Sequence, residues 1–159
     1  TVDFKNTIII MTSNAGVRDV KAGGRIGFSS SNSTEDKYEA MKATVEKFPA
    51  QITEFHLAPQ VNPENGELPY HEWFIEFGKA PADLEAFALQ VDNYLQQKNI
   101  YYKDLITGHI LRTLVITTVA TDGFRNYMKS QGKLGGQNKM PRLSNDRTIA
   151  DELKQWTVC

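Results

Sequence analysis

Apolar and polar residues alternate along two stretches of the chain, 52–61 and 70–77. Phe55 lies in the first stretch and Trp73 in the second. The residues between them read Asn-Pro-Glu-Asn-Gly at 62–66, a combination that favours a tight reversal of the chain. Alternation with a period of two places the apolar side chains on one face of a strand. The pattern therefore predicts an antiparallel pair of strands with one face in contact with solvent.

Helical spacing of apolar residues occurs once before this pair and three times after it. The residues that define the four expected helices are Tyr38, Met41, Val45 and Phe48; Leu84, Phe87, Ala88, Val91 and Leu95; Phe124, Tyr127 and Met128; and Ile149, Leu153 and Trp156. Pro81 suits a first helical turn, and Gly132 suits a helix end. Ser144 or Asn145 can cap the last helix. A further strand over 110–119 completes an α+β fold, with helices packed on a mixed, largely antiparallel sheet.

The chain before Pro49 has a different character. Residues 7–12 form a short β-branched apolar run, typical of a strand that is covered on both faces. Residues 23–34 carry three glycines and a serine-rich tract, which indicates a loop or linker. We therefore expect two parts: a strand, loop and helix fragment at 1–49, and the sheet domain at 50–159.

Composition narrows the choice of partners. The chain has 18 basic and 19 acidic residues, so neither nucleic acid nor an anionic membrane is an expected partner. The longest apolar run, 8–11, is far shorter than the roughly 20 residues that span a bilayer, and no signal pattern is present, so we expect a cytoplasmic protein. His56, His71 and His109 are too widely spaced for a metal motif, and Cys159 is a single cysteine. No metal site is expected.

The basic loop at 133–142 is the most informative local feature. It combines three cations with glycines that let backbone N–H groups approach an anion, and its Lys139 adds a mobile positive charge. A solvated basic turn is the ordinary alternative, because lysine and arginine are mostly exposed. Glu72 and Glu76 share a face of the second predicted strand. A charged surface is the ordinary interpretation of that pair, and a pair of catalytic carboxylates is the alternative.

Three motifs carry a resemblance to a known family. They are His71-Glu72-Trp73-Phe74-Ile75-Glu76-Phe77, Gly123-Phe124-Arg125-Asn126-Tyr127-Met128, and the run from Gly132 through Gln137-Asn138-Lys139-Met140-Pro141-Arg142 to Arg147. In order and spacing, residues 50–156 resemble the C-terminal domain of the Gretchen Hagen auxin-responsive acyl-acid amido synthetases, in their bacterial form. The resemblance implies a mobile domain of an ATP-dependent ligase, which activates a carboxylic acid as an acyl-adenylate and transfers it to an amine.

The same resemblance implies roles for single residues. Lys139, in the Gln-x-Lys-x-Pro-Arg motif, would be the catalytic residue that stabilises charge on the phosphate during adenylation. Gln137 and Arg142 of this motif would contact the cofactor. The large N-terminal core of the family, which nothing before residue 50 resembles, would be the partner that binds ATP, magnesium and the acid. This chain alone is expected to bind neither ATP nor magnesium tightly.

Residues 1–47 resemble part of the second ATPase module of Clp-type AAA+ unfoldases, through the run Val2 to Gly16 and the Arg25-Ile26-Gly27-Phe28 turn. The resemblance implies that Asn14 is the sensor-1 residue, which orients water near the nucleotide γ-phosphate. A turn residue after a strand is the ordinary alternative for Asn14. The sequence has no Gly-x-x-x-x-Gly-Lys-Ser/Thr loop and no acidic Walker B strand, so it predicts no working ATPase.

The two resemblances together indicate a composite chain, joined by gene fusion, engineering or sequence misassembly. The hypothesis is a ligase C-terminal domain fragment that is inactive without an adenylating core. The alternatives are a fragment of a Clp-type unfoldase involved in protein quality control, and a structural remnant without activity.

Overall fold

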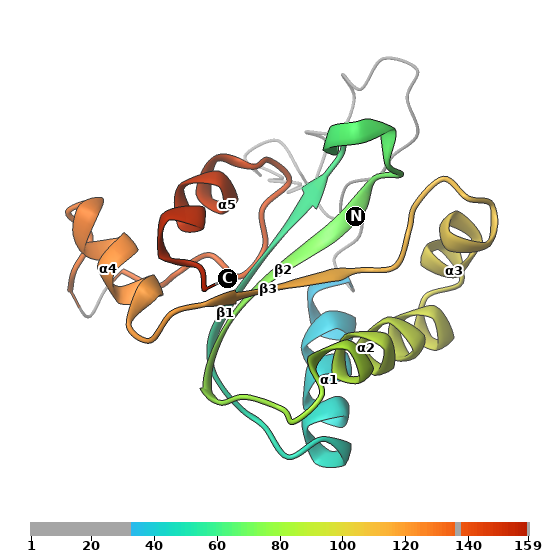
Figure 1. Cartoon of the computed structure of the whole chain (residues 1–159), viewed down its shortest axis with the longest axis horizontal. Coiled ribbons are helices and arrows are strands. Elements are labelled where there is room, and N and C mark those ends of the chain that lie inside the picture. The colour runs from blue at the N-terminus through green and yellow to red at the C-terminus, as the bar shows by residue number, and fades with distance from the viewer. Residues whose placement is uncertain (1–32, 136–137, 159) are drawn as a thin grey trace, which may run out of the picture.

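The computed structural model describes residues 33–135 and 138–158 (Figure 1). The elements in chain order are α1 (Ser33–Lys47), β1 (Gln51–Gln60), the 3-10 turn η2 (Glu64–Gly66), β2 (Tyr70–Lys79), α2 (Leu84–Lys98), α3 (Ile100–Thr107), β3 (Val115–Val119), α4 (Gly123–Ser130), α5 (Thr148–Leu153) and the 3-10 turn η3 (Lys154–Trp156). Within these residues, the sheet has the order β1-β2-β3, with β1 antiparallel and β3 parallel to β2. The prediction of an α+β fold with a mixed sheet is confirmed. The strand expected at 7–12 lies outside the described residues.

The predicted antiparallel pair is confirmed in β1 and β2. Leu57 lies opposite Trp73 and Phe55 lies opposite Ile75, so apolar side chains of the two strands share a face. The reversal between the strands contains η2, and Gly66 takes a φ of 70°, which glycine adopts without strain.

Both faces of the sheet are buried, so the prediction of a solvent-facing side is wrong. Trp73 and Phe74 are neighbours on β2 that point to opposite faces, and both are fully buried. The Trp73 side packs in a core with α1, α2 and α3, whereas the Phe74 side packs with α4 and α5. Figure 1 shows these two groups of helices on opposite sides of the sheet. A strand that is covered on both faces needs no apolar alternation, because helices exclude water from both sides.

β3 is shorter than predicted, because residues 110–114 are held elsewhere. The N–H of Leu111 donates to the Leu105 carbonyl, and that of Arg112 donates to the Pro69 carbonyl. The N–H of Leu114 donates to Asp92 on α2. These bonds bring the chain from α3 to the sheet edge, where only Val115–Val119 pairs with β2.

Some helix boundaries also differ from expectation. α2 begins at Leu84 with Asp83 as its N-cap, rather than at Pro81. Helix α3 was not predicted, because Asn99 ends α2 and its side chain caps α3 at once. The helix over 123–130 is confirmed, and Gly132 follows it with a φ of 67°.

The first described helix packs within the domain. Ala40 and Met41 of α1 are buried in the same core as Phe87 of α2. The predicted boundary between residues 49 and 50 separates α1 from this core, and it stays a prediction that truncation can test. No helix within the described ranges, 33–135 and 138–158, has the length and apolar character needed to cross a membrane.

Candidate functional site

The end of the basic loop is fixed to the edge of β1. The N–H of Leu57 donates to the Arg142 carbonyl at 3.0 Å, and the N–H of Ser144 donates to the Leu57 carbonyl at 2.9 Å. Nδ1 of His56 lies 2.7 Å from the Pro141 carbonyl oxygen. Met140 packs in the core beneath α4 and α5. The residues that follow Lys139 are therefore held by backbone hydrogen bonds and by a buried side chain.

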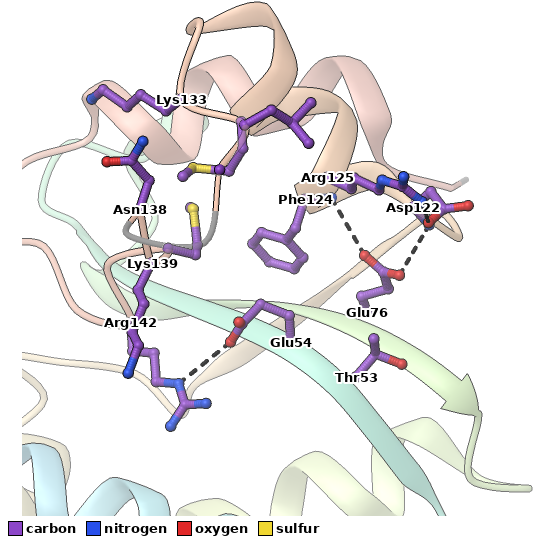
Figure 2. A pocket seen from close by; sticks show the side chains of 14 residues that line it. Thr53, Glu54, Glu76, Asp122, Phe124, Arg125, Lys133, Asn138, Lys139 and Arg142 are labelled. Atoms are coloured by element: carbon purple, nitrogen blue, oxygen red, sulfur yellow. Dashed lines mark hydrogen bonds and ion pairs between the residues drawn. The ribbon is translucent and has the colours of Figure 1, made fainter.

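A pocket of about 1050 Å³ lies between this loop, the start of β1 and the start of α4. Its apolar lining is Phe124, Met128, Leu134 and Met140, and its charged lining is Glu54, Glu76, Asp122, Arg125, Lys133, Lys139 and Arg142. Figure 2 shows the Phe124 ring between two charged sides of the pocket, one with Lys139 and Arg142 and the other with Glu76, Asp122 and Arg125. The pocket thus offers an apolar wall and cations from two directions.

The structure places two of the four predicted site residues at this pocket. Lys139 is exposed on its rim, and Arg142 lines it about half exposed. The Nε of Arg142 binds Glu54 Oε1 at 3.3 Å, and its guanidinium lies 5.0 Å from the centre of the Phe55 ring. Arg142 therefore holds the loop against β1 as well as lining the pocket. Gln137 and Asn14 lie outside the described residues, and the roles given to all four stay predictions.

Glu76 is not the surface residue that its alternation with apolar neighbours indicated. It is 6% exposed, and its carboxylate accepts hydrogen bonds from the N–H of Asp122 at 2.9 Å and of Phe124 at 3.3 Å. It therefore occupies the N-terminal end of α4, where a carboxylate is favoured by the helix dipole. A side chain at Gly123 would collide with Val119, so the turn into α4 requires glycine there.

Glu72 is buried to the same degree by a different set of partners. Its carboxylate binds Nη2 of Arg147 at 2.7 Å and accepts a hydrogen bond from the Thr117 hydroxyl at 2.6 Å. Arg147 also binds Asp151 at 3.1 Å. Glu72 and Glu76 therefore hold β2 to α5 and α4, respectively, and the prediction of a charged surface pair is wrong. Both carboxylates have structural partners, which argues against a catalytic pair.

His56 and His71 lie on the paired strands β1 and β2 but on opposite faces of the sheet, His56 near Phe74 and His71 stacked on Tyr102. Within residues 33–135 and 138–158, no group of three or more His, Cys, Asp or Glu side chains is placed to hold a metal ion.

The longer matches to known proteins lie mainly in the described part of the chain. A family model described as the GH3 family C-terminal domain matches residues 35–148, more than half of the chain. A solved GH3.15 acyl acid amido synthetase superposes with a TM-score of 0.61 at 14% identity, covering 78% of this chain and 24% of the synthetase. AtGH3.15 in complex with 2,4-DB gives the same TM-score at 16% identity and covers 79% and 24%. At these identities the likeness concerns the fold.

Shorter matches involve other families. A model described as PmbA/TldA metallopeptidase domain 1 matches residues 9–49. A ClpA homolog of Guillardia theta is 51% identical over 47 residues, which is 28% of this chain and 6% of that protein. The chloroplastic ClpD2 of Oryza sativa subsp. japonica is 52% identical over 46 residues, which is 28% of this chain and 5% of that protein. The chain thus spans about a quarter of the synthetases and a small part of the Clp proteins.

Proposed function

Because this chain belongs to the GH3 family and carries its C-terminal domain, we propose that it acts as the C-terminal domain of an ATP-dependent acyl-acid amido synthetase. In the proposed reaction, a carboxylate oxygen of the acid attacks the α-phosphorus of ATP and pyrophosphate leaves. An amine then attacks the acyl carbon, and AMP leaves. The chain spans about a quarter of the synthetases that it resembles, so we propose that an N-terminal core supplies the rest.

The observation that carries this proposal is the placement of Lys139. Its side chain is exposed on the rim of the pocket, while Met140 and the residues after it are anchored on the domain. Because the residues that follow Lys139 are anchored, its exposed side chain can present the ammonium group to a negative charge that develops on a neighbouring domain. Fixed charges directed at a developing negative charge in a site without water are worth several kcal/mol.

Arg142 has a second, supporting role in the proposal. Its Nε is engaged with Glu54, and the half-exposed guanidinium lines the same pocket as Lys139. Arg142 and Gln137 would then contact the phosphate after Lys139 has approached it. ATP and magnesium would be held by the core, and the amphipathic lining of the pocket would close over them.

The test measures the two half-reactions separately, with the full chain joined behind the core of a GH3 synthetase. Adenylation is followed by acid-dependent exchange of pyrophosphate into ATP, and transfer by release of AMP from preformed acyl-adenylate. Lys139→Ala should slow adenylation by about 100-fold or more and transfer by much less, because the first step develops charge on the phosphate. Lys133→Ala is the matched control, since Lys133 is an exposed lysine of the same pocket. Equal losses in both half-reactions, or equal effects of the two variants, would contradict the proposal.

A Clp-type fragment is the second candidate, because of the 51% identity over 47 residues. This candidate also predicts no appreciable ATP hydrolysis by this chain alone, because the chain has no Gly-x-x-x-x-Gly-Lys-Ser/Thr loop and no acidic Walker B strand. Hydrolysis that is lost in Asn14→Ala would contradict both candidates, and absence of ligase activity behind a core would favour the Clp-type fragment or a structural remnant.

A further inference from the structure

His56 lies in the middle of β1, opposite Phe74, and is fully buried. Its Nδ1 lies 2.7 Å from the Pro141 carbonyl oxygen, which can only accept a hydrogen bond, so Nδ1 carries the hydrogen. Within the described residues, Nε2 has no hydrogen-bond partner. The one hydrogen bond that this buried ring makes to the protein is therefore directed at the loop that carries Lys139.

The hydrogen bond from His56 reaches the loop at Pro141, a residue whose backbone can make few other hydrogen bonds. Pro141 has no N–H, so its carbonyl is its one backbone group that can hydrogen-bond. After it, the chain joins β1 through the Arg142 carbonyl and the Ser144 N–H, both bonded to Leu57. Lys139 is two residues before Pro141, a span of at most about 7 Å of chain. Within the described residues, the His56 bond is thus the first hydrogen-bonded anchor after Lys139, and it follows the buried side chain of Met140.

We propose that His56 is a positioning residue, which fixes the Pro141 carbonyl and thereby sets where Lys139 stands on the rim of the pocket. The importance given to Lys139 rests on the proposed function. The anchoring itself is a property of this chain and can be measured without any activity.

Burial supports the same assignment, because it lowers the pKa of His56 below 6.5. The bond to Pro141 and the charge of Asp146 oppose this effect, and the charge of Arg147 adds to it. The ring is therefore neutral near pH 7, as the tautomer that donates from Nδ1. This tautomer explains how a histidine is kept in a core with Phe74 and Ala58.

Two substitutions separate the hydrogen bond from the packing. His56→Leu fills much of the space but has no donor, whereas His56→Asn keeps an N–H near the position of Nδ1 and leaves a hollow. Amide hydrogen exchange at Leu57 and Ser144, in the full chain, reports the attachment of the loop, and the amide of Ile75 reports the sheet. His56→Leu should speed exchange at both reporters by about tenfold, as expected for loss of one hydrogen bond, with little change at Ile75. His56→Asn should stay within about threefold of the original chain at these two amides.

The methyl resonances of methionine give a second readout. Met140 adjoins Lys139 and is buried beneath α4 and α5, whereas Met41 is buried on the opposite face of the sheet. His56→Leu should shift the Met140 methyl and leave the Met41 methyl unchanged. Unchanged exchange in His56→Leu, equal acceleration in His56→Asn, or acceleration at Ile75 to the same extent would overturn the inference.

A double-substitution cycle behind the synthetase core keeps this result apart from the proposed function. His56→Leu should slow adenylation, and it should add little once Lys139→Ala is present, because it acts through that lysine. If Lys139→Ala leaves adenylation unchanged, the proposed function fails while the exchange data still decide the anchoring. If the two losses multiply, the positioning role fails.

Discussion

The two faces of the sheet differ in the balance of apolar and polar contacts. On the face that packs against α1, α2 and α3, large apolar side chains such as Trp73 and Phe87 form the larger core, and the buried Asp92 accepts hydrogen bonds from Tyr102 and Leu114. On the face that packs against α4 and α5, the apolar cluster is smaller, and buried polar groups such as Glu72, Glu76 and His56 hold the covering segments. The pocket belongs to this second face. The difference suggests that one face provides stability and the other fixes the geometry of the site.

The largest effect should come from removing α1 from the first face. Deletion of residues 1–49 removes Ala40 and Met41 from the core and uncovers Phe87, whereas deletion of 1–32 leaves α1 in place. We expect the longer deletion to lower the free energy of unfolding by on the order of 5 kcal/mol relative to the shorter one, because loss of α1 exposes apolar surface of the core to water. Urea unfolding of the two truncated chains measures this. Equal stability would place the domain boundary at residue 49/50, as the sequence predicts.

The buried pair on the second face should come next. Glu72→Leu leaves the Arg147 guanidinium without its closest carboxylate, in a position where its side chain is only 14% exposed. Breaking such a pair costs about 3–5 kcal/mol. The control is Glu54→Leu, since the Glu54 and Arg142 pair is more exposed and worth about 1 kcal/mol or less. If urea unfolding gave similar losses of stability for Glu72→Leu and Glu54→Leu, burial of the Glu72 and Arg147 pair would add nothing to the stability of this face.

Lys37 is a cation buried beside the first face, and burial lowers its pKa to about 7. The unfolded chain holds this proton up to about pH 10.5, so the unfolded state binds more protons between pH 7 and 10.5. Stability from this group therefore increases as the pH rises through that window. Lys37→Met should remove this rise, because methionine does not titrate. Unfolding at pH 7 and pH 9.5 measures the rise, and an equal rise in the variant would contradict the explanation.

His56 should give the second face a pH dependence of the same sign, at lower pH. Its folded pKa lies below 6.5, so as the pH falls below 6.5 the unfolded state takes up the proton first. Stability should therefore decrease by at most about 1.4 kcal/mol per pH unit, until the pH reaches the folded pKa. His56→Asn should flatten this decrease below pH 6.5. An equally steep decrease in the variant would assign it to other groups.

The smallest effect should be that of Lys139→Ala on folding. The side chain is exposed, and surface substitutions usually change the free energy of unfolding by no more than about 0.5 kcal/mol. Thermal unfolding of the full chain, with Lys133→Ala as control, measures it. A loss above 2 kcal/mol would make Lys139 part of the structure of the second face rather than of a site.

Local patterns predicted the parts of this fold that local interactions decide. Alternation around Phe55 and Trp73 predicted β1 and β2, and helical spacing predicted α1 and α4. Local patterns did not predict that α4 and α5 bury the second face of the sheet. The partners of Glu72 lie 45 and 75 residues away, and those of Glu76 lie 46 and 48 residues away. No pattern within a strand indicates that a carboxylate will meet them.

The family motif led to Lys139 and Arg142 as expected site residues, and the structure places both at the pocket, while their roles stay predictions. From the sequence, His56 was considered only as a metal ligand, which its spacing excluded. Its partner Pro141 is 85 residues away, so no local pattern indicates their contact. Glycine and proline near a lysine show that a loop is present. They do not show which strand will hold it.

The attachment of the loop to β1 has a consequence for how the molecule assembles. β1 and β2 are joined by a short reversal, so their pairing closes a small loop of chain, whereas Pro141 must find His56 across 85 residues. Closing a long loop costs more conformational entropy, and contacts distant in the sequence are slow to form. We therefore expect the hairpin to form early and the rim that carries Lys139 to be added among the last steps. Segments that join late and by few bonds are also the first to open in the native state, so transient exposure should begin at the rim while the hairpin stays closed.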